Sequence, residues 1–574
     1  MKLLGHHTFK LGADIEQTTY DSHRGYTGGA FWRQSSAYNP NAANPGGRGG
    51  NWTKRTFLDV DPNGTIPCLS DSAMCSEAID GIDANTKNSN IGAYLQDSWQ
   101  IRPNLTLNAG LRWEQQTGGA AEFLQGTVDP NGEIVPNNAF TISNMWAPRI
   151  GLIYDPTQEG RAKLFGHWGR FYESIPMDIN VRAFGGEIIN FSLIRPSASL
   201  SDPRQTICPG AGNSTSVTEL AACGVNNPAF SQAGGGIEIV ANSTKGQYIE
   251  EGILGAEYEL MADFKMGVNY VRRSLPVAIE DMSTDGGNTY FIANPGENFD
   301  AEGDEWDAKA DALALTSPDD PLVGVYHARA DQLRSIKNLD KPVRDYNAIQ
   351  ITANQRFSKS AMLLASYTYS RSVGNFPGLF STETGQLDPN LTSMYDLPDL
   401  MANRYGPMGL DRPHSVKVDG FYQFDLKEAG LIVVGASFRG QSGIAHNALG
   451  GHWAYGSGES YLLPRGSANR SPFTWTTDVK ATYGRRIGKT QTVDVFMDVF
   501  NLFNKQDELD NDEIYTGNNA NPVVGGDLSD LAHAKTLDIG GMEVNETPFV
   551  NKNYGNRNAI QAPLSLRFGL RYTF

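Results

Sequence analysis

Apolar and polar residues alternate one by one over many stretches of the chain, most clearly at its C-terminus. One side of this last stretch carries large apolar residues: Leu564, Leu566, Phe568, Leu570, Tyr572 and Phe574. The other side carries small or charged residues: Ser565, Arg567, Gly569, Arg571 and Thr573. Because successive side chains of a strand point to opposite faces, the pattern predicts a β-strand with one apolar and one wet face.

The same alternation recurs and predicts 14 strands in all. They are an opening strand at 6–20, six hairpins at 89–101 with 104–116, 146–155 with 161–173, 254–260 with 264–270, 347–357 with 361–371, 413–425 with 431–440 and 474–484 with 491–503, and a closing strand at 562–574. Short connections within hairpins alternate with long ones between them. A soluble sandwich would mix the two lengths at both ends. The alternation is typical of a barrel in an outer membrane, with short periplasmic turns and long outer loops.

Aromatic residues gather near the ends of these strands, as the interfacial girdles of a membrane barrel do. Examples are Trp99, Trp113, Trp168, Tyr270 and Trp475. The sequence therefore predicts an all-β protein, a transmembrane antiparallel β-barrel in which residues 1–574 form one barrel domain. We expect the last strand to close the cylinder, which would leave no sheet edge.

The net charge and the positions of the cysteines restrict the classes of function that the chain can have. The net charge of −17 excludes a general nucleic-acid binder, which needs a basic surface. The four cysteines form two close pairs, Cys68 with Cys75 and Cys208 with Cys223, in segments rich in Pro, Gly, Ser and Asn. This setting favours two disulfides over free thiols, whereas a metal site would need closer spacing or nearby histidines.

Several motifs resemble the TonB-dependent outer-membrane receptors, and their order along the chain carries the resemblance. The segment "NIGAYLQDSWQIRPNLTLNAGLRWE" looks like paired strands of that family. The motifs "APRIGLIYDP", "LDRPHSVKVDGFYQF", "YLLPRG", "VDVFMDVFNLFN" and "LRFGLRYTF" are similar to its Oar-like branch. The resemblance implies a protein of the Gram-negative outer membrane, in contact with lipid and lipopolysaccharide. It also implies that the terminal strand, with Leu566, Phe568, Leu570, Tyr572 and Phe574, is the signal read by the barrel-assembly machinery.

The sequence departs from the family at its N-terminal side. Family members have a signal peptide, a TonB box, a plug domain and a barrel of about 22 strands. None of these N-terminal parts is recognisable here, so TonB would act through a missing N-terminal region. About 22 strands less the 14 visible leaves about eight. We therefore expect either the C-terminal part of a receptor barrel or a set of 14 strands that closes alone.

No catalytic motif is present, and we expect no enzyme activity and no cofactor. One acidic segment between Glu280 and Asp320 holds twelve carboxylates and a single lysine. We expect a solvated charged loop there, with a surface Ca²⁺ site as the functional alternative. The candidate ligands are Asp300, Glu302, Asp304, Glu305 and Asp307.

Alternation also places charges of both signs on the inner face: Arg112, Glu114, Arg149, Glu257, Lys417, Asp419, Arg439, Asp494, Asp498, Arg567 and Arg571. Such an interior must be wet or filled by a polar plug. Three functions stay open: a TonB-dependent transporter or receptor for a bulky nutrient, a passive 14-stranded channel, and a surface adhesion or structural protein. The first is favoured by the ordered motifs, and the substrate is not readable from the chain.

Overall fold

The structure is a computed structural model of the chain. It describes residues 6–27, 31–34, 52–58, 78–79, 81–127, 134–175, 177–185, 188–195, 226–234, 238–286, 289–358, 360–378, 393–488, 490–538 and 541–574.

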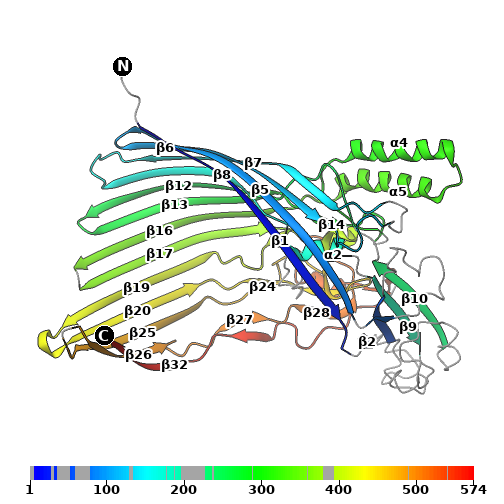
Figure 1. Cartoon of the computed structure of the whole chain (residues 1–574). Helices are drawn as coiled ribbons and strands as arrows, with labels where there is room; N and C mark the ends of the chain where they lie inside the picture. The colour runs from blue at the N-terminus through cyan, green and yellow to red at the C-terminus, as the bar shows by residue number, and fades with distance from the viewer. Residues whose placement is uncertain are drawn as a thin grey trace.

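One large antiparallel sheet dominates the molecule (Figure 1). Its 14 long strands follow one another in chain order across the sheet. They are β1 (His6–Gly25), β5 (Gly81–Arg102), β6 (Leu105–Gly119), β7 (Asn138–Tyr154), β8 (Ala162–Tyr172), β12 (Tyr248–Met261), β13 (Phe264–Val277), β16 (Arg344–Ser358), β17 (Ala361–Gly374), β19 (His414–Asp425), β20 (Leu431–Gln441), β25 (Thr474–Arg486), β26 (Thr492–Phe500) and β32 (Ser565–Thr573). A short strand, β18 (Gly406–Pro407), pairs with β17.

All six predicted hairpins are confirmed, each with a short turn at the same end of the sheet (Figure 1). The turn between β19 and β20 contains Gly430 with φ 116°, a left-handed conformation that favours glycine. A second glycine, Gly569 of β32, is required because a neighbouring side chain approaches its backbone closely. A Cβ there would lie 2.1 Å from the ring of Phe496 on the neighbouring strand.

The sheet is curved into an open trough, and β1 does not close onto β32 (Figure 1). Strand β1 pairs only with β5, and β32 pairs only with β26, within the described part of the chain. The expectation that the last strand closes the cylinder is therefore not met by these 14 strands. Closure requires strand number, tilt and stagger to agree, and the curvature seen here covers only part of a circle.

The long connections fold into smaller units at the other end of the trough (Figure 1). Their strands are β2 (Phe31–Gln34), β3 (Trp52–Leu58), β4 (Ala78–Ile79), β9 (Ile188–Arg195), β10 (Asn226–Gly234), β11 (Ile239–Val240), β14 (Glu280–Met282), β15 (Phe291–Ala293), β21 (Ala445–His446), β22 (Leu449–His452), β23 (Gly456–Tyr461), β24 (Asn469–Arg470), β27 (Glu508–Asn511), β28 (Ile514–Asn519), β29 (Thr536–Leu537), β30 (Glu543–Val544) and β31 (Arg557–Ile560). Their helices are α2 (Met177–Phe184), α4 (Asp300–Thr316), α5 (Pro321–Ser335), and the 3-10 turns η2 (Ile336–Asn338), η3 (Ser393–Tyr395), η4 (Pro398–Met401) and η6 (Asp530–His533). Another 3-10 turn, η5 (Lys427–Ala429), lies at the opposite end of the trough, in the short turn between β19 and β20.

The hydrophobic clusters lie mainly among these connections and at the adjoining strand ends. One gathers around Phe140 and Phe184, a second around Met282, Phe376 and Tyr395, and a third around Leu462. The trough itself exposes large apolar side chains such as Leu570, as a sheet facing lipid does. The packed core of the molecule is therefore in its outer loops.

Candidate functional site: the charged inner face and the outer loops

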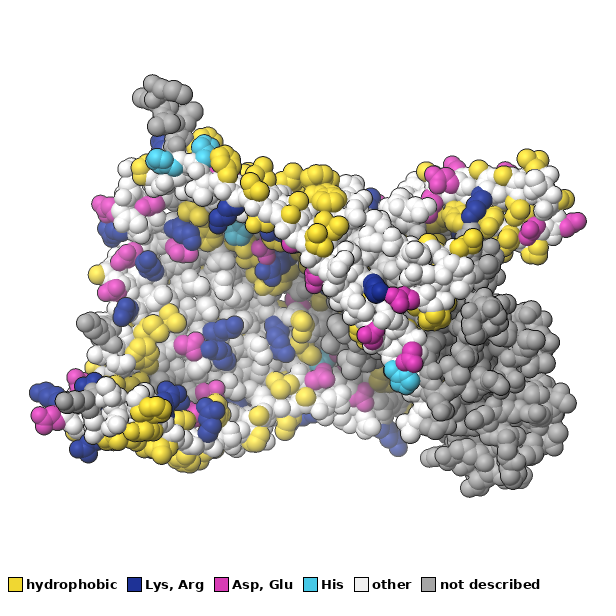
Figure 2. Space-filling view, viewed as in Figure 1, with side chains coloured by type: hydrophobic (Ala, Val, Ile, Leu, Met, Phe, Trp, Pro, Cys, Tyr) yellow, Lys and Arg dark blue, Asp and Glu magenta, His cyan; other side chains and the backbone are white. Residues whose placement is uncertain are grey.

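Charged side chains pair along and across the strands on the hollowed face of the trough (Figure 2). The pairs are Arg112 with Asp14 at 2.8 Å and with Glu114 at 2.8 Å, Lys163 with Glu257 at 3.6 Å, Arg439 with Asp419 at 2.7 Å, and Asp498 with Lys480 at 2.9 Å and with Arg567 at 2.6 Å. The register produces several of them directly, since Asp498 stands opposite both Lys480 and Arg567. Opposite charges at facing positions stabilise a sheet, so this inner face both carries charge and fixes strand register.

The inner-face charges predicted by alternation thus include partners on adjacent strands. Asp14, Lys163 and Lys480 were missed, although each lies at an alternating position of a predicted strand. The period of two was enough to find them.

A recess of about 860 Å³ opens against strands β5 to β8. Two cations in it lie over aromatic rings, Arg149 over Phe171 at 4.6 Å and Lys163 over Phe165 at 4.6 Å. In the described part of the chain no carboxylate pairs with Arg149. Its guanidinium can therefore donate hydrogen bonds to a polar or anionic group that enters the barrel.

The terminal strand β32 presents its apolar row away from the charged face. The exposed fractions are 55% for Leu566, 70% for Phe568, 71% for Leu570, 51% for Tyr572 and 89% for Phe574. Arg567, on the other face, reaches Asp498. The strand therefore has the lipid-facing and inner-facing sides that alternation predicts.

The acidic segment is helical where the sequence suggested a solvated loop. Its central part forms α4, which packs antiparallel to α5 as a hairpin beyond the sheet (Figure 1). Helix α5 begins at an Asp-Pro pair, with Asp320 accepting a hydrogen bond from Leu322 N at 2.9 Å and Pro321 in the first turn. Helix α4 buries only Glu302, Gly303 and Ala310, so it shows no broad apolar stripe that would have identified it.

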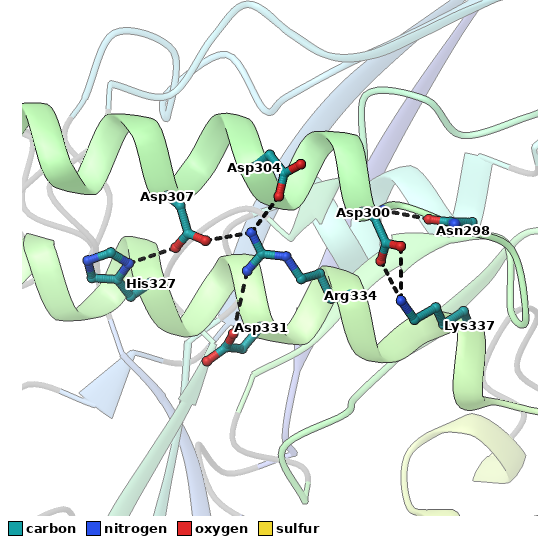
Figure 3. A network of polar contacts seen from close by, with 8 residues as sticks. All are labelled: Asn298, Asp300, Asp304, Asp307, His327, Asp331, Arg334 and Lys337. Carbon is teal, nitrogen blue, oxygen red and sulfur yellow. Dashed lines mark hydrogen bonds and ion pairs between the residues drawn. The ribbon is translucent and has the colours of Figure 1, made fainter.

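The candidate cation ligands in this hairpin mostly have internal partners (Figure 3). Asp304 and Asp307 contact Arg334 at 2.8 and 2.5 Å. Asp300 contacts Lys337 at 2.7 Å, and the buried Glu302 accepts a hydrogen bond from Asn242 N at 2.9 Å. Glu305 is exposed.

These contacts change the acidity of two of the carboxylates. Hydrogen bonds from Lys337 lower the pKa of Asp300, and those from His327 and Arg334 lower the pKa of Asp307. Asp300 and Asp307 are therefore ionised and paired with protein cations. The surface Ca²⁺ site stays a prediction, and an ion would have to compete with Arg334 and Lys337.

The outer loops between β17 and β25 contain a buried polar cluster that the sequence did not reveal. Arg404, 4% exposed, donates hydrogen bonds to Leu400 O at 2.8 Å and Glu459 O at 2.9 Å. Nearby, burial raises the pKa of Asp396 to about 6, although Tyr455 donates a hydrogen bond to it. Asp396 and Tyr455 are 59 residues apart, so no local pattern connects them.

The two cysteine pairs, Cys68 with Cys75 and Cys208 with Cys223, lie outside the described residues. In the part of the chain that the structure describes, no helix has the length and apolar character needed to cross a membrane.

Comparison with known proteins identifies the family to which the chain belongs. A family model described as an outer membrane beta barrel domain matches residues 1–453. The chain is 33% identical over 594 aligned residues to the TonB-dependent transporter Oar of Myxococcus xanthus, covering 100% of this chain and 50% of that protein. It spans about half the length of this curated relative.

Solved structures give weaker matches. The siderophore receptor PiuA of Acinetobacter baumannii aligns with a TM-score of 0.41 and 10% identity, over 88% of this chain and 50% of the receptor. The outer membrane transporter YddB of Escherichia coli aligns with a TM-score of 0.41 and 10% identity, over 88% of this chain and 52% of the transporter. The family match, the strand order and the apolar outward face agree, and the chain belongs to the outer membrane β-barrel family.

Proposed function

We propose that this chain is the barrel part of a TonB-dependent transporter that takes up a bulky nutrient across the outer membrane. The observation that carries the proposal is the 33% identity to the transporter Oar, which extends over the whole chain. A transporter function also accounts for the absence of catalytic motifs in the sequence.

The geometry supports a transport path along the inner face. The paired charges keep that face polar, and Arg149 offers donors to a passing solute. The outer loops would capture the nutrient, and TonB would act on a plug domain to release it into the periplasm. Among the residues that the structure describes, strands β1 and β32 each pair on one side only, and a bilayer does not tolerate an open strand edge. Further strands would therefore complete the barrel in the membrane.

The other partners follow from the same proposal. The apolar row of β32, from Leu566 to Phe574, would be recognised by the barrel-assembly machinery. The outer loops would lie among lipopolysaccharide, whose divalent ions would supply Ca²⁺ to the acidic α4.

Uptake in cells tests the proposal. The gene that encodes this chain is deleted in its host, and uptake is measured for a panel of iron chelates, oligosaccharides and peptides. At least one nutrient should require the gene, an intact TonB and the proton gradient. Arg149→Ala should slow its uptake, whereas the matched outward substitution Leu254→Ala should not. Uptake that needs the gene but neither TonB nor the gradient would indicate a passive channel, and unchanged uptake of every nutrient would refute transport.

A further inference from the structure

One histidine and two carboxylates meet where two outer loops join. The side chains are His446, Asp510 and Glu513, and their nearest ligand atoms all lie within 4.8 Å of one another. His446 Nδ1 is 2.9 Å from Glu513 Oε1 and 3.8 Å from Asp510 Oδ1. His446 is 1% exposed, whereas Asp510 keeps an exposed side. The cluster is therefore anchored inside the protein and open to solvent on one side.

The three residues come from two connections that are far apart in the sequence. His446 ends β21, which pairs with β24 in the connection between β20 and β25. Asp510 lies on β27 and Glu513 directly precedes β28, both in the connection between β26 and β32. Strands β24, β27 and β28 lie beyond the end of the sheet (Figure 1). A hydrogen bond from Leu449 N to Glu513 O at 2.9 Å and the pairing of β22 with β28 hold the two connections in this register.

Neighbouring side chains fix the orientation of the buried His446 and the half-buried Glu513. His446 Nε2 lies 2.6 Å from Ser471 Oγ, and Asn447 donates a hydrogen bond to Glu513 Oε2 at 2.7 Å. Without an ion, Nδ1–H donates to Glu513 Oε1. When an ion replaces that proton, Nε2–H donates to Ser471 Oγ and the Nδ1 lone pair faces the ion between the two carboxylates. A second hydrogen bond of this kind orients most metal-binding histidines.

The charge of the cluster is unbalanced. Two carboxylates surround one imidazole, and among the described residues no Lys or Arg nitrogen lies within salt-bridge distance of Asp510 or Glu513. The acidic residues of α4 differ, because Arg334 and Lys337 neutralise them. A divalent cation would supply the missing positive charge.

We propose that His446, Asp510 and Glu513 bind a divalent transition-metal ion of the Zn²⁺ class. An imidazole nitrogen with carboxylate oxygens suits such ions, whereas Ca²⁺ and Mg²⁺ prefer oxygen ligands alone. Tetrahedral Zn²⁺ with bonds of about 2.1 Å places its ligand atoms about 3.4 Å apart. The observed 2.9 and 3.8 Å lie on either side of that spacing, so small side-chain rotations complete the site. The ion joins the two outer loops, and its fourth position faces solvent.

Zinc loading of the full chain, purified from outer membranes in detergent, tests the site. Protein is saturated with ZnCl2, freed of excess ion by gel filtration and assayed for bound zinc, with affinity taken from competition against a chelator. Glu513→Gln and Asp510→Asn should each weaken binding by more than about 100-fold, and Ser471→Ala by about 10- to 100-fold. The control is Asp399→Asn, which alters a different pair, His452 with one carboxylate at 3.0 Å, and should leave zinc binding unchanged.

X-ray absorption of the zinc-loaded wild type provides a second measurement that does not depend on a variant folding. One imidazole nitrogen and two carboxylate oxygens in the coordination shell support the site. Zinc should also slow cleavage of residues 442–473 by protease in the wild type and not in Asp510→Asn. A shell without imidazole, zinc retained by the Asp510→Asn and Glu513→Gln double variant, loss of zinc in Asp399→Asn, or no tight zinc in the wild type would each overturn the proposal.

Discussion

Replacing Leu570 by arginine tests which face of β32 meets lipid. The strand has nine residues, about the length of a transmembrane strand, and Leu570 lies one residue from its centre with 71% of its side chain exposed. Arginine on the lipid face near the midplane costs about 2–4 kcal/mol in the free energy of folding, and about 0–1 kcal/mol near an interface. Leu570→Arg should therefore cost more than Leu566→Arg, which lies nearer the outer end of the strand.

Arg567→Leu is the matched control on the inner face. It removes the 2.6 Å contact with Asp498, while Lys480 remains 2.9 Å from that carboxylate. Because the Arg567 side chain is 63% exposed, the loss should be at most about 1 kcal/mol. Urea unfolding of the membrane-inserted protein gives both free energies.

Spin labels give an independent reading of the same two faces. Single cysteines at 570 and 567, in a background with the four native cysteines changed to serine, are tested with lipid-soluble and water-soluble quenchers. A label at position 570 should respond to the lipid-soluble quencher, and a label at position 567 should respond to the water-soluble quencher. Reversed responses, or a larger cost for Arg567→Leu than for Leu570→Arg, would refute the face assignment.

Three further predictions concern the outer loops. Mass mapping of non-reduced peptides should find Cys68 linked to Cys75 and Cys208 linked to Cys223, and free thiols or a bridge between the pairs would contradict this. Because burial raises the pKa of Asp396 to about 6, the folded state holds its proton more tightly than the unfolded state, and stability should fall as pH rises from about 4 to about 6. Asp396→Asn should flatten that dependence in thermal unfolding at pH 4.5 and 7.5, and an unchanged slope would exclude Asp396 as its source. Arg334→Ala should reduce hydrogen-exchange protection in α4 and α5 while Arg334→Lys keeps part of it, because the alanine variant leaves Asp304 and Asp307 without their shared partner. If Ca²⁺ binds these carboxylates, it should bind the alanine variant more tightly than the wild type in calorimetry, and equal heats would count against the Ca²⁺ site.

The strands of the sheet could be predicted because apolar and polar residues alternate within each strand. Lipid on one side and a polar interior on the other impose a period of two, which needs no knowledge of the partner strand. The short turns then predicted that consecutive strands pair with each other. Alternation alone predicted that Arg567 lies on the inner face, where it contacts Asp498.

The outer loops were not predictable by the same reasoning. His446 and Glu513 are 67 residues apart, and only the folded loops bring them together. Helix α4 could not be predicted from the sequence, for a different reason. It buries few residues, with Trp306 packing on Tyr326 of α5 as its aromatic contact. Its acidic residues pair with cations on α5 and just beyond it, and no sequence pattern relates these cations to them.

The third hydrophobic cluster has a consequence for how such proteins diversify. Leu462 and Leu463 come from the connection between β20 and β25, and Ala520 and Leu531 from the connection between β26 and β32, yet they share one interior. Exchanging either connection alone for that of a relative would leave half of this interior facing a foreign surface. The two segments should therefore be inherited, recombined or grafted as one module, whereas the short turns at the other end can be exchanged one at a time.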